Sequence, residues 1–395
     1  MQYNDFDSLK NDENNYLMSA YGRFDVCFVK GVGSTLYDIN GKSYVDLTSG
    51  IGVCSLGYGN PYLVDAITNQ ASNLIHVSNL YYTQPVVSLG KKLCEASHFK
   101  KAFFANSGAE ANEGAIKIAR KYSSDKYSAK RNKIITLVNS FHGRTVTTLS
   151  ATGQEKFHKY FYPFTKGFEY VEAGNLEELS IKADDECCAI MIELIQGEGG
   201  VIPLEKSFVE GVMKLCRERD ILLIVDEVQT GIGRTGKLFC YENYGIEPNI
   251  VTLAKGLGGG VPIGCVLADE ITKDVIKPGD HGTTFGGNPL SCACGNAVID
   301  KVNTKEFLDE VNKKAEYIRN RLEELSKEAV KEIRGLGLMI GIVVGEEKKK
   351  ILPQKLLDNG VMVLTAGKDT IRLLPPLTIS YEEIDKAIDI MKGVF

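Results

Sequence analysis

Residues 189–254 alternate between strand-like and helix-like patterns, and this alternation limits the fold more than any other feature of the sequence. Residues 189–196 (AIMIELIQ) form a mostly apolar run of strand length. Residues 207–219 have the apolar spacing of a helix, and residues 221–229 (ILLIVDEVQ) and 249–254 (NIVTLA) predict two further strands. Strand, helix and strand in this order predict a mostly parallel sheet covered on both faces, with ligands at the carboxyl ends of its strands.

The two ends of the chain follow a different pattern. Residues 24–47 predict short strands around a turn at 39–42, and residues from 304 onward predict a long charged helix, short strands and a final amphipathic helix. A chain of 395 residues is also too long for one ordinary core. We therefore expect an α/β protein with a large domain at 51–300 and a small α+β domain built from 1–50 and 301–395.

Composition argues against several classes of protein. The net charge of −5 comes from mixed charges and gives no basic surface for nucleic acid or an anionic membrane. The polar, acidic N-terminus is unlike a secretory or mitochondrial leader, and no apolar run reaches the length of a membrane span. The ten cysteines lack Cys-x-x-Cys spacing and the five histidines are dispersed, so we expect no metal site and a reducing, cytoplasmic location.

Lys255 is the first candidate for chemistry. It follows the strand-like residues IVTLA and precedes the glycine-rich run 256–260. A lysine at a strand end is usually solvated, but this one is predicted to lie at the ligand-binding edge of the sheet, beside backbone that admits a planar ligand. Desolvation there would lower its pKa and make the amine a nucleophile for a Schiff base.

Asp226 and Glu227 end the strand-like run ILLIV, where a carboxylate needs a partner. The protonated ring nitrogen of pyridoxal phosphate is such a partner, and Gln229, two residues on, can hydrogen-bond the ring's phenolic oxygen. A nucleotide hydrolase is the rival hypothesis, because GIGRTGKL (231–238) contains Gly-x4-Gly-Lys. However, Leu238 stands where that motif needs Ser or Thr. The loop also follows the acidic strand, whereas a phosphate-binding loop is expected at the start of its domain.

A phosphate-binding site is predicted at residues 107–109. The segment 103–121 passes from a strand-like stretch through Ser107, Gly108 and Ala109 into a strong helix pattern. Small residues at a helix start leave backbone N–H groups free at the positive end of the helix dipole. Alone this pattern indicates only a helix cap, but with Lys255 and Asp226 it completes a cofactor site.

Six motifs in order carry a specific resemblance: SGAEANEGAIKIARK, FHGRT, IQGEGG, IVDEVQTGIGRTGKL, TLAKGLGGGVPIG and HGTTFGGNPL. Together they resemble the class III (subgroup II) aminotransferases, from about Tyr21 to Pro376. The resemblance implies the fold-type I architecture, pyridoxal 5'-phosphate as cofactor, and a homodimer with active sites at the subunit interface.

The resemblance also implies a role for each matching residue. Lys255 carries the Schiff base, Asp226 and Gln229 bind the ring, Phe141 and Val228 cover its two faces, and Thr284 reaches the phosphate of the neighbouring subunit's cofactor. The remaining residues implied to contact the phosphate or the substrate are Ser107, Gly108, Ala109, Tyr21, Arg144, Glu198, Thr283 and Arg372.

Two arginines indicate the substrates. Arg144 follows Phe-His-Gly, and Arg372 lies in the apolar run IRLLPP, where a charge needs a partner. Two guanidinium forks suit 2-oxoglutarate, which has two carboxylates. An amino donor with one α-carboxylate leaves one arginine to be neutralised, a role that similar enzymes give to a glutamate at the position of Glu198. A structural ion pair is the alternative for either arginine.

Within the family, the resemblance implies transfer of the distal amino group of N2-acetyl-L-ornithine to 2-oxoglutarate, giving N-acetyl-L-glutamate 5-semialdehyde and L-glutamate in arginine biosynthesis. Succinylornithine, succinyl-diaminopimelate, ornithine and 4-aminobutyrate are alternative donors. Members specific for ornithine tend to carry an aromatic residue near Ile51, whose smaller side chain leaves room for an acyl group. A non-catalytic binding protein on the same fold is a further alternative, opposed by the presence of Lys255, Asp226 and Arg372.

Overall fold

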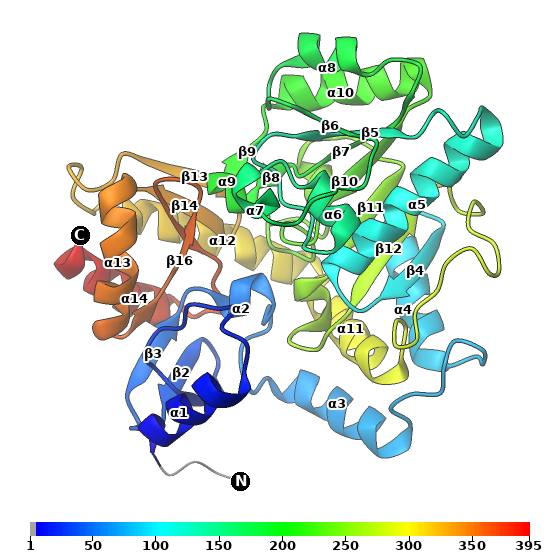
Figure 1. Ribbon diagram of the computed structural model, residues 1–395. Coiled ribbons are helices and arrows are strands. Elements are labelled where there is room, and N and C mark those ends of the chain that lie inside the picture. Colours follow the sequence, from blue (N-terminus) through cyan, green and yellow to red (C-terminus); the bar gives the residue numbers. More distant parts are fainter. Residues whose placement is uncertain (1–4) are drawn as a thin grey trace.

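A seven-stranded sheet lies at the centre of the computed structural model, which describes residues 5–395 (Figure 1). Its strands lie in the spatial order β4 (Lys101–Ala105), β12 (Gly264–Ala268), β11 (Ile250–Leu253), β10 (Leu222–Asp226), β7 (Cys187–Ile192), β5 (Lys133–Leu137) and β6 (Phe168–Val171). Neighbouring strands are parallel except for the two pairs formed by β12. The prediction of a mostly parallel sheet is confirmed.

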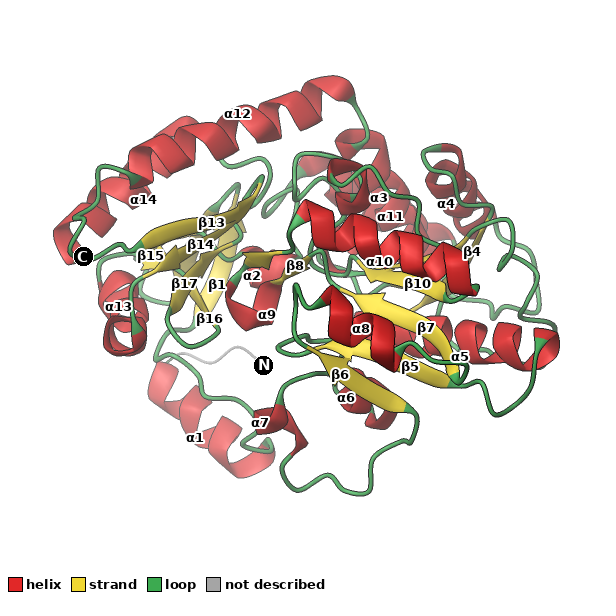
Figure 2. Cartoon of the chain, turned by 90° about the horizontal axis from the view of Figure 1, so that it is seen from above, coloured by secondary structure: helices red, strands yellow, loops and turns green. Residues whose placement is uncertain are grey.

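Helices cover both faces of this sheet. Figure 2 shows α8 (Leu176–Lys182) and α10 (Lys206–Arg219) on one face, with α5 (Gly108–Lys126) and α6 (Val146–Ala151) on the other. β10 and β7 are buried along their whole length because both faces are covered, which explains their continuous apolar sequences. On the side of β4, α11 (Pro289–Val302) packs against α3 (Pro61–Asn73) and α4 (Gln84–Glu95).

Residues from both ends of the chain build the smaller sheets. β1 (Phe28–Val32), β2 (Thr35–Asp38) and β3 (Ser43–Asp46) form an antiparallel meander, and β15 (Val361–Met362) adds to β3 in parallel. A second sheet has the order β13 (Glu332–Leu336), β14 (Met339–Val343), β17 (Thr370–Leu373) and β16 (Leu364–Ala366). Figure 1 shows the N-terminal strands beside α13 (Glu346–Asp358) and α14 (Tyr381–Val394). α12 (Lys305–Leu322) also contacts α14.

Several predicted boundaries shift in the structure. The strand expected at 189–196 ends at Ile192, and a separate short strand β8 (Ile195–Gln196) pairs with β9 (Ile202–Pro203). The strand expected at 221–229 ends at Asp226, and residues 227–229 turn away from the sheet. The helix expected near 352–358 begins earlier, at Glu346. Across residues 5–395, no helix is both long enough and apolar enough to cross a bilayer.

Candidate active site

A cavity of about 450 Å³ opens at the carboxyl edge of the central sheet. Each strand near it ends with a residue or loop that lines the cavity: Ser107 follows β4, Phe141 follows β5, Glu193 follows β7, Asp226 ends β10 and Lys255 follows β11. β12 runs the other way, so Ile263 lines the same edge from its amino end. The volume lies within the range of roughly 300–1,000 Å³ typical of small-molecule sites.

Lys255 begins a short 3₁₀ helix, η2 (Lys255–Gly258), which a single residue, Ala254, separates from β11. Its φ of 41° lies in the left-handed region, where a side chain is strained and which is common at functional sites. Burial, together with the positive charge of Arg372, lowers the pKa of the Lys255 amine to about 8. At pH 7 roughly a tenth of the amine is therefore unprotonated and nucleophilic, far more than for a lysine of ordinary pKa.

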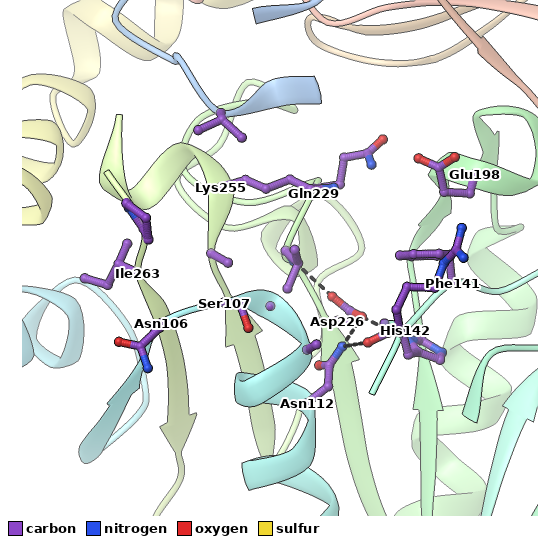
Figure 3. A pocket seen from close by; sticks show the side chains of 18 of the residues that line it. Asn106, Ser107, Asn112, Phe141, His142, Glu198, Asp226, Gln229, Lys255 and Ile263 are labelled. Atoms are coloured by element: carbon purple, nitrogen blue, oxygen red, sulfur yellow. Dashed lines mark hydrogen bonds and ion pairs between the residues drawn. The ribbon is translucent and has the colours of Figure 1, made fainter. Parts of the chain in front are cut away.

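Asp226 is buried and held by three donors (Figure 3). Its Oδ1 accepts from the backbone N–H of Val228 at 3.0 Å, and its Oδ2 accepts from Asn112 Nδ2 at 2.8 Å. His142 Nδ1 lies 2.8 Å from the same Oδ2. Asn112 also donates to the carbonyl of His142 at 2.7 Å, which fixes the ring beside the carboxylate. The carboxylate lines the cavity in a single orientation and can accept one further N–H there.

The start of α5 supplies an anion site at the cavity wall. Ser107 is the N-cap, and its side chain accepts from the backbone N–H of Glu110 at 3.2 Å. The N–H groups of Gly108 and Ala109 are the first two of the helix, which have no partner within a helix. Gly108 is also required by space, because a Cβ atom there would lie 2.7 Å from Cγ1 of Val228.

Gly108→Ala should therefore weaken cofactor retention. The new methyl group must displace Val228 or tilt the start of α5, and such overpacking costs about 1–3 kcal/mol, enough to weaken binding roughly 5- to 150-fold. Gly393→Ala is the matched control, because a Cβ atom at Gly393 meets nothing within 4 Å. Equilibrium dialysis of pyridoxal phosphate from the two variants measures the difference, and equal retention would contradict the steric argument.

Arg372 and Glu198 form an ion pair at the rim of the cavity. Arg372 is buried on β17, and its Nη1 donates to Glu198 Oε1 at 2.6 Å and to Gln229 Oε1 at 3.0 Å. Burial alone raises the pKa of Glu198, but the charge and hydrogen bond of Arg372 outweigh it, so this pKa lies below its ordinary value. Within the described chain Arg372 Nε is buried without a partner, so part of the guanidinium remains unpaired.

Glu198 lies on α9 (Gly197–Gly200), a single helical turn, although a Gly-Glu-Gly-Gly sequence by itself favours a flexible turn. The backbone N–H of Gly367 donates to the Glu198 carbonyl at 2.9 Å. A Cβ atom at Gly199 would lie 3.0 Å from the carbonyl of Asn139, so the neighbouring segments leave little room around this turn. Any change in the Glu198–Arg372 pair must therefore come mainly from rotation of side chains.

The other predicted site residues are distributed unevenly. Phe141, Arg144 and Val228 line the cavity. Thr283 lies beside it, because its Oγ1 accepts from Asn106 Nδ2 at 2.9 Å and Asn106 is a lining residue. Thr284 and Tyr21 are exposed and do not line the cavity of the single chain; the ring of Tyr21 lies 5.6 Å from the Arg23 guanidinium.

A left-handed turn borders the cavity opposite α5. Four consecutive residues of α2 (Ser49–Gly52) have positive φ, at 42°, 64°, 67° and 77°. Left-handed helix costs non-glycine residues about 1–2 kcal/mol each, so Ser49 and Ile51 are strained. The turn is held by Ser49 Oγ, which donates to the Leu374 carbonyl at 2.6 Å, and it leads directly to Val53, which lines the cavity.

Asn112, His142 and Glu193 are among the cavity residues that were not singled out from the sequence. Glu193 accepts from the backbone N–H of Phe141 at 2.8 Å, and burial raises the pKa of its carboxyl to about 7. Its position within the apolar run 189–196 was a usable signal, because a buried acid needs partners. Asn112 carried no such signal, since its role depends on how α5 lies against β10.

The chemistry of these side chains fits pyridoxal phosphate. Lys255 offers an amine of lowered pKa, Asp226 offers an acceptor for a protonated ring nitrogen, and the start of α5 offers N–H groups for a phosphate. All three features lie at the carboxyl edge of a mostly parallel sheet. This fold and this site together define a pyridoxal-phosphate-dependent enzyme of fold type I.

Comparisons with known proteins give the family. The model of the family "Aminotransferase class-III" matches residues 16–395, so the chain belongs to the class III aminotransferases. It is 53% identical over 384 residues to the acetylornithine aminotransferase of Caldanaerobacter subterraneus subsp. tengcongensis, covering 97% of this chain and 98% of the relative. Members of this family depend on pyridoxal phosphate, so the chain is a pyridoxal-phosphate-dependent aminotransferase.

Solved structures agree with this assignment. The ornithine aminotransferase of Toxoplasma gondii, with pyridoxal phosphate partly occupying its active site, superimposes with a TM-score of 0.94 at 32% identity, covering 100% of this chain and 96% of that one. The N-acetylornithine aminotransferase of Stenotrophomonas maltophilia gives a TM-score of 0.84 at 34% identity, covering 97% of both chains.

Proposed function

We propose that the protein transfers the distal amino group of N2-acetyl-L-ornithine to 2-oxoglutarate, giving N-acetyl-L-glutamate 5-semialdehyde and L-glutamate. The observation that carries the proposal is the pair of arginines at the cavity: Arg372 is already neutralised by Glu198, whereas Arg144 forms no ion pair with any described residue. One free guanidinium suits a donor with one α-carboxylate, and two suit a dicarboxylic acceptor. The relative that is 53% identical bears the same activity in its name.

In this proposal each side chain holds one part of the cofactor. Asp226 keeps the ring nitrogen protonated, with Asn112 and His142 orienting the carboxylate. Gln229 presents its amide N–H₂ to the phenolic oxygen, because its Oε1 is taken by Arg372. Ser107, Gly108 and Ala109 bind the phosphate, and Phe141 and Val228 cover the two faces of the ring.

Lys255 has two functions in the proposed mechanism. Pyridoxal phosphate, when bound, supplies an aldehyde that joins amines covalently and a ring that delocalises an electron pair. The Lys255 amine would hold the bound cofactor at its aldehyde carbon, and once released from it, Nζ could accept the proton from the carbon that bears the donor's amine. A pKa near 8 suits both directions of this transfer at neutral pH.

A panel of amino donors with 2-oxoglutarate as the common acceptor tests the proposed substrate. N2-acetyl-L-ornithine should give a higher kcat/KM than ornithine or 4-aminobutyrate, because Ile51 at the strained turn leaves room for an acyl group. Succinylornithine and succinyl-diaminopimelate belong in the same panel. A higher kcat/KM for a donor other than N2-acetyl-L-ornithine would replace it in the proposal.

We also propose a homodimer with shared active sites. Two segments, 74–82 and 281–287, lie side by side, since Asn79 Nδ2 donates to the carbonyls of Thr283 at 3.2 Å and Gly286 at 2.8 Å. Large apolar side chains on them are exposed in the single chain: Leu80 at 86%, Tyr82 at 100% and Phe285 at 61%. Large exposed apolar side chains on two adjoining segments favour a protein interface. Thr284 lies on this surface and would reach the partner's phosphate.

Thr284→Ala should weaken cofactor retention more than it weakens folding. Loss of a hydrogen bond to a charged phosphate costs about 1.5–3 kcal/mol, or roughly 10- to 100-fold in affinity. The side chain is exposed within its own chain, so the melting temperature of the cofactor-free protein should change little. Dialysis measures retention and light scattering measures the dimer. A dimeric variant that retains the cofactor like the wild type would contradict the shared site.

A further inference from the structure

The short helix α7 (Glu155–His158) is fastened to the loop that carries Phe141 and Arg144. Before it, Gln154 Nε2 donates to the carbonyls of Asn139 at 3.2 Å and Ser140 at 3.0 Å. At its end, His158 Nε2 lies 3.0 Å from the Leu149 carbonyl and 2.7 Å from the Thr152 carbonyl. Both anchoring side chains are buried. Lys156 and Phe157 lie between these two anchors and are therefore held in place beside the cavity.

Phe157 is the main contact of the Arg144 guanidinium. The Arg144 Cζ atom lies 4.0 Å from the centre of the Phe157 ring and 5.6 Å from that of Phe141. The two rings meet edge to face, with centres 5.7 Å apart. Among residues 5–395, no carboxylate pairs with Arg144, which lines the cavity. The guanidinium is therefore oriented by an aromatic face and not by a negative charge.

Lys156 adds a second positive charge to the same ring. Its Nζ lies 4.7 Å from the centre of Phe157, and it too has no ion pair within the described chain. Burial, Lys349 and Arg144 lower the pKa of the Lys156 amine, against the opposing charge of Glu198. Glu198 is already paired with Arg372, and Lys349 Nζ donates to the Gly367 carbonyl at 2.6 Å. Arg144, which lines the cavity, and Lys156, on the same phenyl ring, thus form a local excess of positive charge.

We propose that Lys156 and Phe157 complete the binding site for the substrate carboxylate that Arg144 receives. Phe157 is a positioning residue, because its ring holds the guanidinium toward the cavity. Lys156 provides a second charge for the same carboxylate and compensates part of its lost hydration. The inference rests on the proposed function and extends it: specificity for a dicarboxylic acceptor requires α7 as well as the two arginines.

Glutarate, an unreactive dicarboxylate, is the probe for this site, with its Kd measured by calorimetry on the holoenzyme. Phe157→Leu removes the aromatic face and keeps apolar volume, and it should weaken glutarate about 2- to 5-fold, as expected for an exposed cation–π contact. Phe157→Tyr keeps the face and should restore binding. In an Arg144→Gln background Phe157→Leu should have no further effect, whereas independent, additive losses would overturn the positioning role.

Lys156→Gln should weaken glutarate by a similar factor and reduce the dependence of its Kd on salt. Lys159→Gln is the matched control, since Lys159 is exposed, lies three residues away and has its Nζ over the ring of Tyr160 instead. The kinetic readout is kcat/KM for 2-oxoglutarate relative to pyruvate, which lacks the second carboxylate. This ratio should fall in Phe157→Leu and Lys156→Gln, through KM more than kcat.

The outcomes separate this inference from the proposed function. A wild-type protein that prefers another amino donor, yet shows the predicted glutarate pattern, refutes only the donor. An active wild type whose glutarate affinity and acceptor ratio are unchanged by both substitutions refutes the role of α7. Absence of glutarate binding to the wild type refutes it as well. If Phe157→Leu fails to fold, Lys156→Gln still decides the result.

Discussion

Lys255→Ala should fold, and it should lose turnover by at least three orders of magnitude. The substitution removes both the amine that joins the cofactor and the general base, and general base catalysis alone contributes roughly 10²–10⁴-fold. The side chain is only partly buried, and alanine at φ 41° is strained much as lysine is, so the fold loses little. Turnover should be measured in steady state with saturating pyridoxal phosphate.

Two observations separate chemistry from folding in this test. Borohydride reduction should fix the cofactor covalently on the wild type but not on Lys255→Ala. Lys237→Ala is the control, because Lys237 is exposed, and this variant should behave like the wild type. A small exogenous amine such as methylamine should restore part of the lost rate, because it replaces the missing base. A near-normal rate in Lys255→Ala without added amine would refute the assignment of this lysine.

The sequence was sufficient to predict β7, β10 and β11 of the central sheet, because these strands are apolar runs of strand length near an amphipathic helix. β5 and β6 were not predicted. Residues 187–192 and 222–226 pair in parallel, as the strand–helix–strand order requires. The reversed strand β12 was not predicted, since the glycine-rich run before it shows a turn without the direction of the following strand. The pairing of Val361 with Val45 was equally hidden, because it joins segments more than 300 residues apart. The domain boundaries at 51 and 300 stay predictions.

Some residues of the site could be located from the sequence, and others required the structure. Lys255 and Asp226 could be located because each directly follows or ends an apolar strand, and such strand ends converge at one edge of a parallel sheet. Asn112 and Phe157 could not, because their partners, Asp226 and Arg144, are brought to them only by helix packing. The geometry of Glu198 also required the structure, since the Gly-Glu-Gly-Gly sequence suggested mobility and the chain forms a fixed helical turn there.

Arg372→Ala and Glu198→Ala should damage opposite halves of the reaction. With 2-oxoglutarate bound, we expect the α-carboxylate to replace Glu198 on Arg372 and the γ-carboxylate to bind Arg144. Arg372→Ala removes a charge-assisted fork, a loss on the order of 10²- to 10³-fold in the acceptor half-reaction. The donor half-reaction uses Arg144 for its single carboxylate and should suffer much less. Single-turnover kinetics with each substrate alone measures the two halves.

Glu198→Ala leaves Arg372 free in both half-reactions. The α-carboxylate of a donor can then bind Arg372 in place of Arg144, which brings the α-nitrogen to the cofactor and holds the distal amine away from it. In N2-acetyl-L-ornithine this nitrogen is acylated and cannot react, whereas in glutamate it is a free amine. The ω-amine half-reaction should slow, and the preference should shift toward α-amino donors such as glutamate. Breaking a buried pair also destabilises a protein by about 3–5 kcal/mol, and the 26% exposure of Glu198 should reduce this cost.

Glu198→Gln distinguishes neutralisation of charge from placement by a hydrogen bond. Arg372 Nη1 lies 2.6 Å from Glu198 Oε1 in the structure. A glutamine side chain keeps an acceptor for this hydrogen bond but carries no charge. If the negative charge matters, Glu198→Gln should show the same shift in donor preference as Glu198→Ala while retaining more stability. If Glu198→Ala lowers both half-reactions equally and leaves donor preference unchanged, Glu198 has only a structural role, because an exchange of partners on Arg372 must affect the two substrates differently.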